Sequence, residues 1–321
     1  MKHSFFKQTL WAILLAFLSA TAFVPARLSA DEPAKAQQAT GKCMMWKVSS
    51  PTATVYLVGS MHLATPAMYP LPKEMEAAFA SADTLVVEVN IEKIDQAKMM
   101  AFVQEKGMYG GNEKLSDNLK PETWEKLKDQ CEKLGLFEAG IQKMKPWLLS
   151  MTMQVLQVQK LGLDSSLGID KHFLDLAAKK GTKVDELESA EFQMNLLAGL
   201  DAKAQEHQLV RALDESKNLK EDVADIEQAW IAGDPTAMEK QLTKRQKDHP
   251  EAAAAAQKLI YDRNGPMAEK VEAYLKGNKT VFVIAGCAHM VGDKGIVRIL
   301  QKDNFKVDQS TATPEGNVER K

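Results

Sequence analysis

Cysteine is scarce in this 321-residue sequence, and neither charge is in clear excess. Cys43, Cys131 and Cys287 are too few for a disulfide scaffold. The sequence does not say which two of them, if any, would pair in an oxidising compartment. With 41 basic and 43 acidic residues, the formal net charge is −2. A mildly acidic chain lacks the basic surface that nucleic-acid binding requires, so we expect no nucleic-acid partner.

The sequence also lacks a hydrophobic run long enough to cross a bilayer, which takes roughly 20 residues. The apolar stretch at residues 9–24 follows a basic N-terminus and precedes a small-residue pattern at 28–30 that is typical of a cleavage site. We therefore expect residues 1–30 to be a signal peptide and residues 31–42 a flexible leader. The mature protein is expected to be periplasmic or secreted, with no stable membrane anchor after cleavage.

Signatures of nucleophilic catalysis are missing as well. Ser60 lacks the second glycine of a Gly-x-Ser-x-Gly elbow. Cys287 lies only two residues before His289, too close along the chain for an obvious nucleophile and base. Neither a serine nor a cysteine hydrolase is predicted.

What the sequence does contain is a Gly-x-x-His pattern in two copies, at residues 59–62 and 286–289. Each copy directly follows a run of β-branched, aromatic and other apolar residues, at 54–58 and at 281–285. Such runs predict buried strands that end at the glycine. Gly59 and Gly286 allow a tight turn or a close backbone approach, so the histidine three positions on can point back over the strand end.

The segments around the first copy predict a βαβ unit. Strands are predicted at 44–47, 54–58 and 85–89, and a helix is predicted at 72–80. Because the last two strands are joined through that helix, we expect them to be parallel. The sequence thus favours an α/β fold with a mixed or mainly parallel central sheet.

The middle of the chain, about residues 91–275, is almost entirely helical in pattern and is predicted to be a large inserted lobe. One short strand at 182–187 is expected to return to the sheet. The polar segment 203–247 is expected to be solvated rather than part of a core. After a helix at 269–276, the pattern returns to α/β, ending with a short strand at 305–307. We expect the domain to cover residues 43–308 and a disordered tail to cover 309–321.

His62, His289 and Glu88 all follow or end predicted strands, so they are the candidate site. In open parallel sheets the ligand crevice lies outside the carboxyl ends of the strands. Two imidazoles and one carboxylate are the ligand set of open zinc sites and of other divalent-metal sites. The same trio could act as general acid and base without a metal. Glu88 sits in an apolar run, where a buried carboxylate requires a cation, a metal or hydrogen-bond donors.

Two further charged residues allow either a functional or a structural interpretation. Arg263 is expected to end a helix, where it would neutralise the helix dipole. Asp170 begins a predicted helix, where aspartate is common. We keep Arg263 as a candidate catalytic residue and Asp170, with Gly59 and Gly286, as possible accessory residues.

Seven groups of residues, in order along nearly the whole chain, carry a family resemblance: 46–48; 54–63 with 68–70; 83–90; 168–170; 191–193; 263–264 with 267–268; and 281–295. In these segments the sequence resembles the TraB/GumN family, which includes the ectodomains of the Tiki-type membrane proteases. The resemblance implies a fold related to those of erythromycin esterases and a haem-binding lipoprotein. It places the family's paired histidines, glutamate and arginine on His62, His289, Glu88 and Arg263. It also implies dependence on a divalent metal, with manganese or cobalt favoured, and the ligand set adds zinc as a candidate.

The resulting hypothesis is a secreted or periplasmic metal-dependent hydrolase, with peptidase as the favoured class and a peptide or small molecule as substrate. The metal would be held by His62, Glu88 and His289, and Arg263 would stabilise an oxyanion or hold a substrate carboxylate. One alternative is a non-catalytic protein of the same fold that binds haem, a metal or a polysaccharide precursor. Another is a metal-independent esterase that uses His62 or His289 with Glu88.

Overall fold

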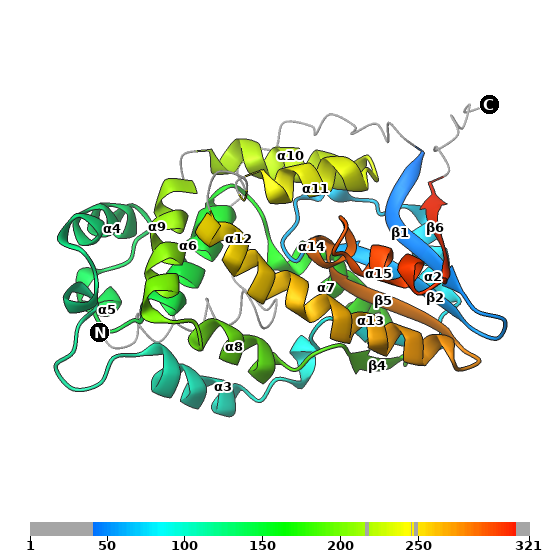
Figure 1. Cartoon of the computed structure of the whole chain (residues 1–321), viewed down its shortest axis with the longest axis horizontal. Helices are drawn as coiled ribbons and strands as arrows, with labels where there is room; N and C mark the ends of the chain where they lie inside the picture. The colour runs from blue at the N-terminus through cyan, green and yellow to red at the C-terminus, as the bar shows by residue number, and fades with distance from the viewer. Residues whose placement is uncertain (1–40, 216–217, 245, 247–249, 313–321) are drawn as a thin grey trace.

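The computed structural model describes residues 41–215, 218–244, 246 and 250–312 (Figure 1). The expected signal peptide at residues 1–30 lies outside the described residues, as does nearly all of the expected leader. No helix in the described ranges is both long enough and apolar enough to cross a membrane.

Six strands form one sheet in the order β4-β3-β5-β2-β1-β6. Their bounds are β1 (Lys42–Ser49), β2 (Thr54–Ser60), β3 (Thr84–Val87), β4 (Lys183–Glu186), β5 (Thr280–Gly286) and β6 (Lys306–Thr311). The four strands from β4 to β2 are parallel, whereas β1 is antiparallel to both of its neighbours. The expected α/β fold with a mixed, mainly parallel sheet is therefore confirmed.

The two strands that precede the Gly-x-x-His segments are neighbours. β2 and β5 pair in parallel, and Ser60 at the end of β2 lies opposite Gly286 at the end of β5. β3 pairs with β5 on its other side, also in parallel. All three strands therefore end at the same edge of the sheet, which confirms the predicted arrangement.

Helices surround the sheet and extend away from it as a lobe, which lies on the left in Figure 1. Their bounds are α2 (Lys73–Ala80), α3 (Gln96–Phe102), α4 (Pro121–Lys133), α5 (Glu138–Ile141), α6 (Pro146–Lys160), α7 (Ile169–Lys180), α8 (Ala190–Ala198), α9 (Ala202–Glu215), α10 (Leu219–Ile231), α11 (Pro235–Thr243), α12 (Pro250–Ala256), α13 (Asp262–Leu275), α14 (Cys287–Met290) and α15 (Ile296–Lys302). Proline occupies the first turn of α4 and α6, where its missing N–H costs no hydrogen bond. Gly181 ends α7 with a left-handed φ of 72°.

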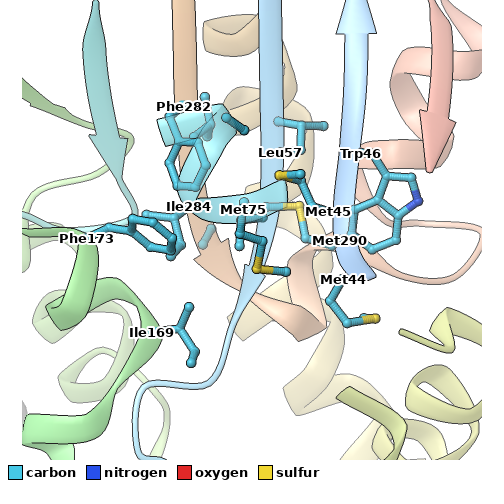
Figure 2. Packing of buried hydrophobic residues seen from close by; sticks show 14 of the residues in the cluster. Met44, Met45, Trp46, Leu57, Met75, Ile169, Phe173, Phe282, Ile284 and Met290 are labelled. Atoms are coloured by element: carbon cyan, nitrogen blue, oxygen red, sulfur yellow. The ribbon is translucent and has the colours of Figure 1, made fainter. Parts of the chain in front are cut away.

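The described residues contain two separate hydrophobic cores. The larger one packs helices against the sheet, and Figure 2 shows Phe173 of α7 beside Phe282 of β5. The ring centroids of these two residues are 4.6 Å apart. The smaller core lies within the lobe, around Leu127 of α4 and Trp147 of α6. Helices α3, α4, α6 and α9 therefore pack around a centre of their own, whereas α7, α10 and α13, which also lie within residues 91–275, pack against the sheet.

The expectation that residues 203–247 are solvated is wrong for the inner faces of α9 and α10. Leu209 is fully buried in the core of the lobe. Trp230 is 3% exposed and belongs to the sheet core. Its indole Nε1 donates a hydrogen bond of 2.7 Å to the carbonyl of Gly59. The segment is polar on average, but α9 and α10 each have one apolar face that packs into a core. The buried face of α10 also supports the first Gly-x-x-His loop.

The structure answers a question that the sequence left open and corrects one further expectation. All three cysteines are free thiols buried in the protein, so none of them forms the disulfide that an oxidising compartment would allow. Burial raises the pKa of the Cys131 thiol to about 12. At the other end of the chain, β6 pairs with β1 as far as Thr311. The expected disordered tail from residue 309 is therefore wrong for residues 309–311.

Replacing Gly233 by alanine is expected to lower the free energy of unfolding by about 2–5 kcal/mol. Gly233 has a φ of 61°, and a Cβ built on it would lie 2.4 Å from the carbonyl oxygen of Lys42. The matched control is Gly181→Ala, where φ is 72° but no atom lies within 4 Å of the added Cβ. This control should cost only about 1–2 kcal/mol of backbone strain. Equal effects of the two substitutions in urea unfolding would show that the contact with Lys42 does not matter.

Candidate functional site

Three candidate side chains meet at the carboxyl ends of β2, β3 and β5. Glu88 directly follows β3, His62 lies two residues beyond β2, and His289 lies in α14 immediately after β5. His62 Nε2 is 3.6 Å from Glu88 Oε2, and His289 Nε2 is 3.6 Å from Glu88 Oε1. Each imidazole therefore faces a different oxygen of the same carboxylate.

Gly286 supplies the space in which these side chains meet. A Cβ built on it would lie 3.1 Å from His62 Nε2, 3.5 Å from Glu88 Oε2 and 3.8 Å from His289 Cδ2. Its N–H donates a 2.9 Å hydrogen bond to Glu88 Oε2. Because Gly286 has an ordinary φ of −51°, the position requires glycine for close approach and not for a left-handed turn. Gly59 is similar, since its Cβ would lie 2.8 Å from the sulfur of Cys287.

Asp170, at the start of α7, orients His62. Its Oδ1 is 3.1 Å from His62 Nδ1 and also accepts a 2.7 Å hydrogen bond from the hydroxyl of Ser60. Gly168 packs against the carbonyl of His62, where a Cβ would come within 2.5 Å of the oxygen. Burial would lower the pKa of His62, but the carboxylates of Asp170 and Glu88 outweigh it and raise that pKa well above its usual value. Asp170 thus has a structural link to the site that its sequence position alone did not establish.

His289 is held by Asn264, a residue that the sequence analysis did not single out. Asn264 Nδ2 donates a 2.7 Å hydrogen bond to the carbonyl of Lys294, so its Oδ1 is the atom that faces the ring. That oxygen lies 2.6 Å from His289 Nδ1 and accepts a hydrogen bond from the Nδ1–H group. Because Nδ1 faces Asn264, Nε2 is the ring nitrogen of His289 that faces Glu88.

Arg263 contacts Glu88 from the first turn of α13, and not from the end of a helix as expected. Its Nη2 donates to Glu88 Oε1 at 2.7 Å and to Glu188 Oε2 at 2.5 Å. Nε donates to Glu188 Oε1 at 3.0 Å, and Nη1 donates to the carbonyl of Leu259 at 2.7 Å. An arginine has five N–H donors, so these contacts leave at most one for a substrate.

Glu188 and Gln193 were also missed by sequence reasoning. Gln193 Nε2 lies 2.8 Å from Glu88 Oε1 and 3.0 Å from Glu188 Oε2, so the amide bridges the two carboxylates. Glu188 follows the parallel strand β4 by two residues. Glu88 was selected because it is a carboxylate at the carboxyl end of a parallel strand. The same rule would have found Glu188.

The charges of this cluster do not balance within the protein. Glu88, Glu188 and Asp170 carry three negative charges when ionised, whereas Arg263 carries one positive charge. Burial would raise the pKa of Glu88, but its contacts with the two imidazoles hold that pKa well below its usual value. Two negative charges therefore remain for a divalent cation or for protonated imidazoles to neutralise.

Within the described ranges, no group of three or more His, Cys, Asp or Glu side chains is placed so that it could hold a metal ion. His62, Glu88 and His289 fit a divalent cation by their donor types, two imidazoles and one carboxylate. The two distances of 3.6 Å between imidazole and carboxylate are near the separation of ligand atoms around a tetrahedral ion, about 3.4 Å for bonds of about 2.1 Å. Both rings have Nδ1 engaged by an acceptor, as in metal-bound histidines generally. Such an ion would share Glu88 Oε1 with Arg263 and Gln193, and Glu88 Oε2 with the N–H of Gly286.

The cluster is open to solvent on one side. The His62 side chain is 49% exposed, whereas those of Glu88 and His289 are 11% and 5% exposed. The cluster is therefore reached from solvent on the side of His62.

The sequence matches one family model and is similar to several uncharacterized proteins. A family model described as the TraB/PrgY/gumN family matches residues 44–309. Over 150 residues the chain is 30% identical to the uncharacterized protein YbaP of Escherichia coli (strain K12), a match covering 46% of this chain and 53% of YbaP. The chain thus spans about half the length of that relative. Over 272 residues it is 21% identical to an uncharacterized protein of Treponema pallidum (strain Nichols), covering 81% of this chain and 80% of that protein. No solved structure matches.

Proposed function

The chain belongs to the TraB/PrgY/gumN family, and we propose that it is a metal-dependent hydrolase, with peptides as the favoured substrate class. The proposal rests on one observation, the orientation of the two imidazoles. Asp170 engages Nδ1 of His62 and Asn264 engages Nδ1 of His289, so both Nε2 atoms face Glu88. The signal-peptide pattern of the sequence adds the proposal that the enzyme acts in the periplasm or outside the cell.

In this proposal His62, Glu88 and His289 hold a manganese, cobalt or zinc ion. When bound, such an ion lowers the pKa of a coordinated water and polarises the carbonyl under attack. His62 lines the open side of the site and orients the incoming substrate there. Arg263 fixes Glu88 and has at most one remaining N–H to donate to a substrate oxygen. Gly286 keeps the centre free of protein atoms.

A second candidate is a metal-independent hydrolase, and the contact between Asp170 and His62 favours it. A histidine oriented by a carboxylate is a common arrangement in general acid–base catalysis. In that mechanism His62, which Asp170 and Glu88 favour in its protonated form, would donate a proton to the leaving group. Glu88, which Arg263 would hold ionised, would accept a proton from the attacking water. The two candidates differ in whether removing divalent cations abolishes activity.

Replacing either histidine of the site by alanine is expected to weaken divalent-cation binding at least tenfold. The measurement is calorimetric titration of the parent, His62→Ala and His289→Ala with manganese, cobalt and zinc chlorides, with the visible absorption of bound cobalt as a second signal. The matched control is His207→Ala, on the exposed face of α9, which should bind like the parent.

Each outcome of this experiment separates the candidates. If the parent binds no cation and hydrolyses a panel of peptides and esters equally well with and without chelator, the metal-independent enzyme replaces the proposal. If it shows no hydrolysis of that panel and binds no cation, a non-catalytic binding protein replaces both.

A further inference from the structure

We infer that Glu188 is a positioning residue of this site, which holds Arg263 so that only one N–H of the guanidinium reaches Glu88. The inference rests on the proposed function, since it explains how Glu88 stays available to a cation beside an arginine. Nothing in the family match or in the sequence pattern assigns a role to Glu188.

The backbone places the two glutamates side by side. The N–H of Glu188 donates a 2.9 Å hydrogen bond to the carbonyl of Glu88, and Leu187 donates one of 2.8 Å to Val87. These bonds follow directly after Val87 and Glu186, the last paired residues of β3 and β4. The Glu188 side chain is 9% exposed, so its charge is as buried as that of Glu88.

Arg263 donates more hydrogen bonds to Glu188 than to Glu88. Glu188 receives Nε at 3.0 Å and Nη2 at 2.5 Å, which is the two-pronged geometry that best fits a guanidinium to a carboxylate. Glu88 receives Nη2 alone, at 2.7 Å. The carbonyl of Leu259 holds Nη1 on the other side. The guanidinium therefore cannot present both Nε and Nη2 to Glu88 while Glu188 is ionised.

Gln193 completes the arrangement from α8. Its amide nitrogen contacts both carboxylates, which keeps them at a fixed separation. Ser189 caps this helix by accepting a 3.1 Å hydrogen bond from the N–H of Phe192. The segment from β4 into α8 is thus anchored at both of its ends, and Glu188 lies between those anchors.

Without the charge of Glu188, Glu88 is the only carboxylate among the described residues that still pairs with Arg263. We expect the guanidinium to donate from both Nε and Nη2 to Glu88 and to compete with a cation for the two oxygens of that carboxylate. Loss of a residue that supports a metal ligand typically weakens metal binding by about 10–100-fold. A purely structural role would instead lower the stability of the protein and leave the affinity of the folded form unchanged.

The test compares Glu188→Gln with the parent by titration with cobalt chloride, following the visible absorption of bound cobalt. We expect a dissociation constant at least tenfold higher for Glu188→Gln and an intermediate value for Glu188→Asp, which retains the charge on a shorter side chain. The matched control is Glu191→Gln, which removes an exposed carboxylate from α8 and should leave the affinity unchanged. Equal affinities of the parent and Glu188→Gln would overturn the inference and leave the proposed function standing.

A second readout does not require a metal. The Nε–H of Arg263, assigned in a ¹H–¹⁵N spectrum by its loss in Arg263→Lys, should exchange slowly in the apo parent because Glu188 accepts it. In Glu188→Gln this signal should disappear or exchange at least tenfold faster, and its persistence would overturn the inference. If the parent binds no cobalt, the proposed function fails, and the Nε–H signal alone decides whether Glu188 positions Arg263. Glu188→Asp serves for both readouts if Glu188→Gln does not fold.

Discussion

Replacing Arg263 by alanine is expected to lower the free energy of unfolding by roughly 3–5 kcal/mol. The substitution leaves Glu88 and Glu188 as buried carboxylates joined to one glutamine, with no cation between them. The Arg263 side chain is itself only 11% exposed, so water cannot replace it without a rearrangement of the site. The measurement is urea unfolding at neutral pH in the presence of a chelator, so that bound cations do not mask the effect.

Arg298→Ala is the matched control for this prediction. Arg298 is exposed on α15 and contacts Gln301 within the same helix, so its loss should change stability by no more than about 0.5 kcal/mol. A double variant, Arg263→Ala with Glu188→Gln, should recover part of the loss because it removes one of the two like charges. An Arg263→Ala variant as stable as Arg298→Ala would show that the carboxylates do not depend on the guanidinium.

The position of the histidines could be predicted from the sequence because the relevant pattern is local. Residues 54–58 and 281–285 are apolar and β-branched, and each run stops at a glycine. Once such strands are parallel, their carboxyl ends must share one edge of the sheet. The only step beyond local pattern was the assumption that β2 and β5 are neighbours, which their pairing confirms.

The position of Arg263 could not be predicted in the same way. Asn264, Gly265 and Pro266 follow it, and that composition is typical of a helix end. In the structure helical conformation continues from residue 250 to residue 275, with a π-helical turn at Gln257–Tyr261. Packing of Met267, Ala268 and Val271 into the sheet core outweighs the helix-breaking tendency of this short segment. Such compensation depends on distant residues and leaves no local signal.

The residues that support the site were the hardest to predict. Glu188 follows two other acidic residues, Asp185 and Glu186. Its carboxylate therefore did not stand out in the sequence, whereas that of Glu88 did because it lies in an apolar run. Asn264 and Gln193 act on the site only because α13 and α8 bring them against His289 and Glu88. Hydrogen bonds of this kind join residues far apart in sequence, and neither spacing nor hydropathy records them.

The convergence of the three side chains can be tested without removing any of them, by placing a side chain at Gly286. Gly286→Val is expected to weaken divalent-cation binding and to lower any hydrolytic activity, each by about 100-fold or more, because displacement of catalytic groups by about 1 Å can cost that much. A Cβ at this position already comes within 3.1 Å of His62 Nε2, and valine adds two methyl groups beyond it. The smaller Gly286→Ala should give a weaker effect in the same direction.

The fold should survive Gly286→Val. The backbone of Gly286 has an ordinary φ of −51°, so valine adds crowding without conformational strain there. Crowding of this kind typically costs about 1–3 kcal/mol. Circular dichroism and thermal unfolding check that the variant is folded, and cobalt titration measures its affinity. Gly110→Val is the control, because no atom lies within 4 Å of a Cβ built on Gly110. A folded Gly286→Val protein that binds cobalt as tightly as Gly110→Val would place the cation elsewhere, since valine fills the point where His62, Glu88 and His289 meet.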